Sequence, residues 1–259
     1  MDIEGRIILV TGAASGIGEG MCHAFAARGA QRVIVTDIDE EGARRVAAVI
    51  GGDHARVDVS SESDMARVIG EVEAEFGRLD ILCANAGIAV DGSVDAPDDD
   101  WHRSWSVNLM AHVYAARHAL PGMLQRSSGY IVTTASAAGL LTNLGAAPYT
   151  VTKHAAVALA EWLAITYRSR GIRVSCLCPQ FVDTPMLDVF AGHTDGMRSW
   201  VEGIAIPVDE VAEAVMLGIE QERFLILPHP EVSDYVLNKA ADPDRWIAGM
   251  ARLQASMES

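Results

Sequence analysis

The clearest candidates for chemistry are a tyrosine and a lysine four positions apart, Tyr149 and Lys153. They open an apolar stretch that runs to about residue 170 without Gly or Pro, which predicts a buried helix. Residues four apart share one face of a helix, so the phenol and the ammonium can point into one site. A nearby cation favours the phenolate, so the sequence predicts a Tyr149 pKa below the ordinary value of about 10 and a role in general acid–base catalysis. The alternative is an ordinary pair on a helix surface.

A glycine-rich turn near the N-terminus predicts a dinucleotide site. The apolar, β-branched run 6–10 leads into Gly12, Gly16 and Gly18, and an amphipathic helix follows. This order of strand, glycine turn and helix is typical of pyrophosphate binding at a helix N-terminus. Gly12 permits the turn, Gly16 lets the backbone approach the phosphates, and Gly18 allows close packing of the helix.

Asp37 indicates which nucleotide binds. It ends the next predicted strand, nineteen residues after Gly18. An acid near this spacing binds the ribose hydroxyls of the adenosine, and its charge would repel the additional phosphate of NADP. No basic residue follows at position 38, which is Ile38. The sequence therefore predicts NAD in preference to NADP, whereas a helix cap is the alternative role for this aspartate.

The elements that must position these residues alternate between strands and helices along the whole chain. This pattern predicts an α/β fold with a Rossmann-type, doubly wound parallel sheet of about seven strands, covered by helices on both faces. The predicted strands are 6–10, 32–37, 54–58, 79–84, 130–134, 173–178 and 224–227. Helices are predicted between 61 and 77 and over 101–114, 149–170 and 208–220. Without an internal linker or repeat, residues 1–259 are expected to form a single domain, with a mobile apolar flap over 183–206 and a helical tail over 229–259.

Composition limits the possible partners. A net charge of −15 argues against nucleic acid, which requires a basic surface. The four cysteines are scattered among apolar residues, so we expect reduced core thiols and no metal site. The acidic N-terminus is neither a signal peptide nor a membrane span, so the cytoplasm is the expected location and no membrane partner is expected.

Taken together, these motifs resemble those of the short-chain dehydrogenase/reductase family over about residues 5–230. The turn from Thr11 to Gly18 resembles the family's cofactor loop, and Asn85-Ala86-Gly87 resembles its sheet-stabilising motif. The order and approximate spacing of the family's catalytic tetrad recur in Asn108, Ser136, Tyr149 and Lys153. The chain departs from the pattern after the sixth predicted strand, where Gln180 follows Pro179 in place of the usual glycine.

The resemblance implies a mechanism and its residues. Tyr149 would exchange a proton with the substrate oxygen, and Ser136 would bond that oxygen. Lys153 would lower the tyrosine pKa and bind the nicotinamide ribose, while Asn108 would hold a water that relays protons to Lys153. The implied cofactor-binding residues are Gly12, Ser15, Gly16, Ile17, Gly18, Asp37, Ile38, Asp58, Val59, Asn85, Ala86, Gly87, Thr134, Tyr149, Lys153, Pro179, Val182 and Thr184.

The walls of the substrate pocket are expected to be largely apolar. They are predicted from Ser136, Ala138, Leu140, Leu141, Leu144, Gln180, Phe181, Met186, Leu187 and Phe190. This favours an NAD(H)-dependent oxidoreductase that interconverts a fairly apolar secondary alcohol and its ketone, and the resemblance implies a homotetramer. Two alternatives stay open: an epimerase, lyase or dehydratase on the same fold, and a non-catalytic NAD-binding regulator.

Overall fold

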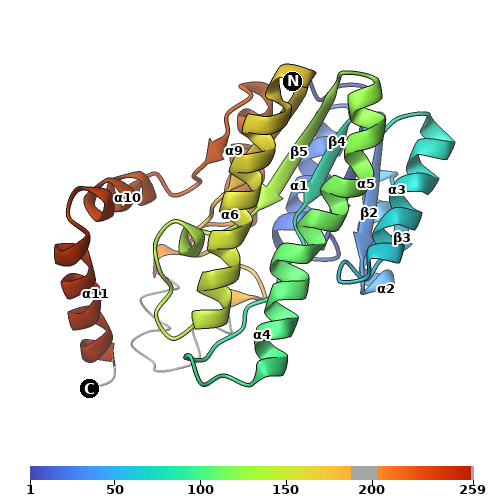
Figure 1. Ribbon diagram of the computed structural model, residues 1–259. Coiled ribbons are helices and arrows are strands. Elements are labelled where there is room, and N and C mark those ends of the chain that lie inside the picture. The colour runs from blue at the N-terminus through green and yellow to red at the C-terminus, as the bar shows by residue number, and fades with distance from the viewer. Residues whose placement is uncertain (188–202, 258–259) are drawn as a thin grey trace.

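One parallel sheet of seven strands forms the centre of the protein, in the order β3-β2-β1-β4-β5-β6-β7 (Figure 1). The computed structural model describes residues 1–187 and 203–257. The strands are β1 (Ile7–Thr11), β2 (Arg32–Asp37), β3 (Asp53–Arg56), β4 (Ile81–Ala84), β5 (Gly129–Thr134), β6 (Ile172–Leu177) and β7 (Leu225–Ile226). The predicted doubly wound sheet is confirmed, although the ends of every strand except β2 differ from the predicted ranges by one or two residues. Because β1 lies between β2 and β4, its carboxyl end flanks the switch point where such sheets bind ligands.

Helices cover both faces of this sheet. Helices α1 (Gly16–Ala27), α2 (Glu40–Ile50) and α9 (Val208–Glu220) pack on one face, and α3 (Glu62–Phe76), α5 (Ala111–Gln125) and α6 (Ala147–Tyr167) pack on the other. Successive residues of β1 enter opposite cores: Ile7 and Leu9 pack with the α5 side, and Ile8 and Val10 pack with the α1 side. A strand buried on both faces needs apolar residues throughout, which explains the unbroken run in the sequence.

Two helical regions differ from the sequence prediction. Helix α2 was not predicted, and it begins after Asp39, whose carboxylate accepts the N–H of Gly42. The helix predicted over 101–114 is present but longer and not uniform, because α4 (Asp98–Trp105) and α5 are joined by a π-helical turn, η1 (Ser106–Met110). This turn includes Asn108, whose side chain is held by a distant loop described below.

The C-terminal tail forms two helices, α10 (Glu231–Ala241) and α11 (Pro243–Met257). Figure 1 shows this pair, hereafter the C-terminal hairpin, extending to one side of the sheet. Most of the predicted flap lies outside the described residues; its described ends are joined by a bridge between Val182 and Ile206. None of the helices in the ranges 1–187 and 203–257 is long and apolar enough to cross a membrane.

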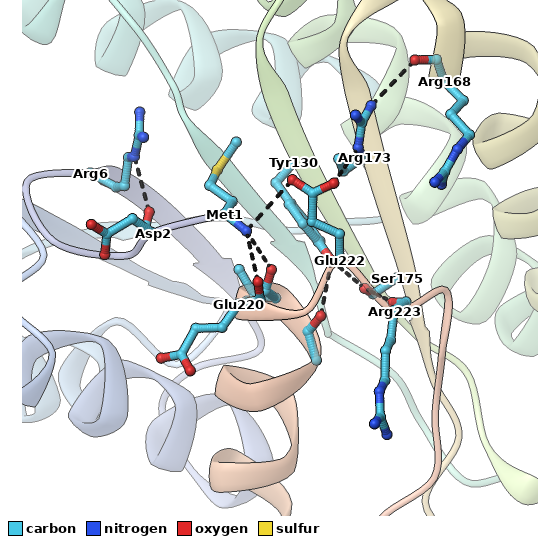
Figure 2. Close-up of polar contacts among 12 residues, drawn as sticks. Met1, Asp2, Arg6, Tyr130, Arg168, Arg173, Ser175, Glu220, Glu222 and Arg223 are labelled. Carbon is cyan, nitrogen blue, oxygen red and sulfur yellow. Dashed lines mark hydrogen bonds and ion pairs between the residues drawn. The ribbon is translucent and has the colours of Figure 1, made fainter.

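A polar cluster closes the amino ends of β5 and β6 (Figure 2). The Met1 ammonium donates to the carbonyl of Ile219 at 2.7 Å and lies 3.7 Å from the Glu222 carboxylate. Arg173 pairs with the same carboxylate at 2.6 Å, and below it the buried Tyr130 hydroxyl lies 2.7 Å from the Ser175 hydroxyl. The N-terminus is thereby fixed to the corner between α9 and β7, at the edge of the sheet opposite the predicted site.

Candidate active site

A cavity of about 440 Å³ opens at the carboxyl ends of the strands. This volume falls in the range of small-molecule and cofactor sites. It brings together most of the residues that the sequence predicted for the nucleotide, the chemistry and the substrate. The predicted residues that line it are Gly12, Ser15, Gly16, Ile17, Asp37, Ile38, Asp58, Val59, Asn85, Ala86, Gly87, Thr134, Ser136, Tyr149, Lys153, Pro179, Gln180, Phe181, Val182, Thr184, Met186 and Leu187.

Other predicted residues do not line the cavity. Gly18 lies beneath the glycine loop, where a Cβ would stand 2.1 Å from the carbonyl oxygen of Gly12, so close packing explains this glycine. Asn108, Ala138 and Leu144 are also outside the lining. Phe190 lies outside the described residues.

Several lining residues were not predicted. Each lies next in sequence to a predicted residue, and this adjacency is the feature of the sequence that could have identified them. They are Val57, Ile88, Val107, Ala135 and Pro185.

The glycine loop is shaped for an anion. Gly12 has φ +63°, and a Cβ there would lie 2.6 Å from the Cα of Ala86, so only glycine fits. Gly16 also has a positive φ, +56°. Ser15 precedes α1 with extended backbone and does not cap the helix with its side chain, so the first N–H groups of α1 can bind a phosphate. The loop therefore fits the pyrophosphate of a dinucleotide.

Asn85 joins the ends of three strands beneath this loop. Its amide nitrogen donates to the carbonyls of Thr11 and Gly12 at 3.0 and 3.2 Å. Its side-chain oxygen accepts the Thr134 hydroxyl at 3.0 Å. Thr11 and Thr134 end β1 and β5, so one amide fixes the spacing of the strands that carry the glycine loop and the catalytic serine.

Asp37 faces the glycine loop from the end of β2. One of its carboxylate oxygens accepts the N–H of Ala14 at 3.0 Å, and the other accepts the N–H of Asp39 at 3.0 Å. Arg45 of α2, which the sequence analysis did not single out, donates to the carbonyl of the same Ala14 at 2.8 Å. Asp37, which lines the cavity, thus binds the N–H of Ala14, and Arg45, which does not line it, binds the carbonyl of Ala14.

Ser136, Tyr149 and Lys153 meet at the other end of the cavity. Ser136 follows β5 and caps the short 3₁₀ turn η2 (Ala137–Gly139), because its hydroxyl accepts the N–H of Ala138 at 3.0 Å. Tyr149 lies in the first turn of α6, and Lys153 lies one turn later on the same face. The Lys153 ammonium is 3% exposed, donates to the carbonyl of Thr134 at 3.0 Å and lies 5.6 Å from the centre of the Tyr149 ring.

Burial shifts the pKa values of Tyr149 and Lys153 in opposite directions. Burial raises the pKa of Tyr149, and a hydrogen bond with Ser136 acts in the opposite direction. Burial also lowers the pKa of Lys153, to about 8. Burial is thus the largest influence on the Tyr149 pKa in the protein without a nucleotide, and a lowering of this pKa by Lys153 stays a prediction.

Asn108 holds the backbone of one cavity wall. Its side-chain oxygen accepts the N–H of Ile88 at 2.8 Å, and its nitrogen donates to the Ile88 carbonyl at 3.0 Å. The same nitrogen lies 3.2 Å from the Thr152 hydroxyl, next to Lys153. A Cβ at Gly87 would stand 3.2 Å from the Lys153 nitrogen and 3.3 Å from the Asn108 oxygen, so these two polar atoms flank one small space.

Three predicted walls of the substrate pocket are placed differently. Leu140 and Leu141 pack against the C-terminal hairpin, with Val232 and Trp246, and do not face the cavity. Ala138 packs beside Tyr149 in a small cluster of its own. These three residues are therefore not among the described residues that line the cavity, because apolar type alone does not indicate which side of a turn a side chain covers.

Comparison with known proteins agrees with this geometry. The model of the family described as short chain dehydrogenase matches residues 6–193. Borneol dehydrogenase, mitochondrial, of Lavandula x intermedia is 33% identical, with 88% of each chain covered. Meso-2,3-butanediol dehydrogenase of Serratia marcescens is 36% identical, with 72% of this chain and 75% of the relative covered.

Solved structures share the fold. A short chain dehydrogenase/reductase from Burkholderia phymatum in complex with NAD has a TM-score of 0.84 and 27% identity, covering 94% of this chain and 96% of its own. A 3-ketoacyl-(acyl-carrier-protein) reductase from Brucella melitensis complexed with NADH has a TM-score of 0.80 and 29% identity, covering 87% of this chain and 96% of its own. From its fold, its site and these relatives, the chain belongs to the short-chain dehydrogenase family of oxidoreductases.

Proposed function

We propose that the protein is an NAD(H)-dependent dehydrogenase that interconverts a secondary alcohol and its ketone. The observation that carries the proposal is the convergence of Ser136, Tyr149 and Lys153 on the cavity that the glycine loop also lines. The relatives named as borneol and butanediol dehydrogenases support the alcohol class.

The proposed chemistry assigns one task to each side chain. Tyr149 takes the proton of the alcohol during oxidation and returns it during ketone reduction. Ser136 donates a hydrogen bond to the substrate oxygen, where negative charge develops. Lys153 holds positive charge beside the phenol and binds the nicotinamide ribose. When bound, NAD(H) accepts or supplies the hydride.

The proposed proton path leaves through Lys153 and Asn108. The space that a side chain at Gly87 would occupy is flanked by the Lys153 nitrogen and the Asn108 oxygen, at 3.2 and 3.3 Å. A water between these atoms would accept a hydrogen bond from the Lys153 ammonium and donate one to the Asn108 side-chain oxygen. The hydrogen bonds of Asn108 to Ile88 support this role, because they hold the amide in one orientation.

The nucleotide preference is proposed to be NAD over NADP. Asp37 lines the cavity and uses its carboxylate to accept backbone N–H groups, so a negative charge stands where the additional phosphate of NADP would bind. The neighbouring complexes with NAD and NADH support this choice.

The substrate is proposed to be uncharged and fairly apolar. Phe181, Met186 and Leu187 line the cavity together with Tyr149, and Gln180 adds one amide that can bond a polar substituent. We also propose that the protein acts in the cytoplasm, because its four cysteines are buried free thiols, which persist in reducing compartments.

A homo-oligomer is part of the proposal. Helix α6 exposes an apolar stripe that includes Val151, Trp162 and Ile165, which are 46%, 56% and 74% exposed. Trp162 lies about three turns after Val151, and Ile165 lies about one turn after Trp162, so the three residues share one face of the helix. Together with the tetramers of the family, this stripe supports pairing of subunits through α6.

A panel of secondary alcohols and ketones followed by NADH absorbance tests the proposed reaction. Replacing Tyr149→Phe removes the proton donor and is expected to lower kcat by roughly 10²- to 10⁴-fold. NADH binding should remain, because the nucleotide contacts of the glycine loop are intact. Activity at the wild-type level in Tyr149→Phe contradicts the assignment of the phenol.

The same assays separate the alternatives. A product formed without a net change in NADH absorbance would indicate an epimerase, lyase or dehydratase. Tight NADH binding without turnover of any alcohol or ketone would indicate a regulator.

A further inference from the structure

The C-terminal hairpin contacts the turn that carries the catalytic serine. Val232 of α10 is fully buried against Ala137 and Leu141, and Trp246 of α11 packs on the same cluster. Ala137 opens η2, the turn capped by Ser136. An apolar contact thus links a helix pair at the edge of the molecule to the serine of the site.

Lys239 of α10 adds a directed contact to this cluster. Its ammonium donates to the carbonyls of Leu140 and Leu141, at 2.8 and 3.4 Å. The N–H groups of both residues bond back to Ala137, so these two carbonyls end the helical turn. The carbonyls at the end of a helical turn lack partners within the turn and attract a cation, and hydrogen bonds to a charged donor are stronger than neutral ones.

The base of the hairpin holds a second loop of the cavity. His229 lies between β7 and α10, is 3% exposed, and accepts the N–H of Gln180 at 3.2 Å. Gln180 lines the cavity at the position where the chain departs from the family pattern. The hairpin therefore contacts the Ser136 turn and the segment before it contacts the Gln180 loop, whereas Gly12, Asp37 and the rest of the nucleotide end are formed by other elements.

We infer that Lys239 is a positioning residue that holds the Ser136 turn in its catalytic geometry, with the C-terminal hairpin as its support. The inference rests on the proposed function, since it assigns Lys239 an effect on the alcohol and ketone reaction. Lys239 acts through the carbonyls of Leu140 and Leu141 and does not touch the substrate. Loss of its charge should therefore affect the substrate steps and leave nucleotide binding unchanged.

Lys239→Met tests this inference, with Lys239→Arg as the conservative variant. The matched control is Arg252→Met, which removes the charge of an exposed arginine in α11 of the same hairpin. Lys239→Met should lower kcat/KM for the ketone roughly tenfold, the effect of one charge-assisted hydrogen bond, with the NADH dissociation constant unchanged. Lys239→Arg should recover most of the loss, and Arg252→Met should match the wild type. If Lys239→Met does not fold, Lys239→Gln keeps a neutral donor and serves in its place.

Amide hydrogen exchange provides a readout that needs no turnover. The Leu140 and Leu141 amides should exchange roughly tenfold faster in Lys239→Met, while amides of the glycine loop keep their rates. If the exchange of these two amides and kcat/KM are both unchanged, the inference is wrong. If the wild type reduces no ketone, the proposed function fails, and the exchange rates still decide whether Lys239 holds the turn.

Discussion

Asp37 and Arg45 both hydrogen-bond to the backbone of Ala14, and their opposite charges bear on the choice between NAD and NADP. The carboxylate and the guanidinium bond the N–H and the carbonyl of Ala14, at 3.0 and 2.8 Å. The carboxylate favours free ribose hydroxyls, whereas the guanidinium would favour a phosphate. The proposed preference for NAD therefore depends on the Asp37 charge, because the Arg45 guanidinium contacts the same residue.

Asp37→Asn should therefore weaken the preference for NAD. Asparagine keeps an oxygen that can accept the N–H of Ala14 but removes the charge that repels the phosphate. The ratio of kcat/KM for NADP to that for NAD is expected to rise roughly tenfold or more, since like charges in contact cost up to several kcal/mol.

The cation can be tested in the same background. Adding Arg45→Ala to Asp37→Asn should remove most of the gain with NADP, whereas Arg45→Ala alone should leave activity with NAD near the wild-type level. An unchanged preference in Asp37→Asn would show that Asp37 does not select the nucleotide.

At the scale of elements, the spacing of apolar residues predicted the type of most helices and strands, but it did not predict local features that depend on contacts between distant parts of the chain. Continuous apolar spacing indicated one helix over 101–114, yet Asn108 bonds both backbone groups of Ile88, twenty positions earlier, and the helix there takes a π-helical turn. The spacing of apolar residues within a helix cannot predict a hydrogen-bond partner so distant in the chain. Likewise, the apolar type of Leu140 and Leu141 predicted walls of the substrate pocket, whereas these residues pack against the C-terminal hairpin.

Helix α5 carries a buried histidine that should make stability depend on pH. His112 is 2% exposed, and neither of its ring nitrogens has a hydrogen-bond partner in the part of the chain that the structure describes. Burial and the charge of Lys153 lower the pKa of His112 to about 3. The folded state therefore keeps this ring neutral at pH values where the unfolded chain, with a pKa near 6.5, binds a proton.

The His112 contribution to the free energy of unfolding is complete above about pH 6.5 and is lost as pH falls from there towards 3. The loss is about 1.4 kcal/mol for each pH unit in that window. His112→Leu should remove this part of the pH slope, as measured by urea unfolding at pH 7.5, 6 and 5. His102→Gln, at an exposed position of α4, is the matched control and should keep the slope. The same slope in His112→Leu and in the wild type would contradict the prediction.

At the scale of the whole molecule, the fold and the location of the site could be predicted, whereas the substrate walls could not. Strand, glycine turn and acid follow a local order, so Gly12 and Asp37 were assigned correctly to one cavity with Tyr149. The walls come from loops that meet only in the folded chain: Ile88 and Pro185, for example, both line the cavity although 97 positions separate them.

The exposed stripe on α6 predicts the oligomeric state. Wild-type protein should elute as an oligomer in size-exclusion chromatography with light scattering, and Trp162→Asp with Ile165→Asp should shift it to a smaller species, because two charges would be buried in the interface. Ile247→Asp, at an equally apolar and exposed position of α11, is the control and should leave the mass unchanged. A monomeric wild-type protein would rule out this interface.

Because the chain has so few lysines, chemical labelling of its amines can report which part of the protein opens. The chain has two lysines, so with the N-terminus it has three amines. Each is tied to a backbone carbonyl: Met1 at the corner of α9, Lys153 at the end of β5, and Lys239 at the Ser136 turn. An amine that is held in such a contact reacts slowly with acylating reagents. Mass spectrometry of the native protein after brief acylation would thus show separately, from the peptide that is modified, whether the sheet corner, the active site or the hairpin opens first.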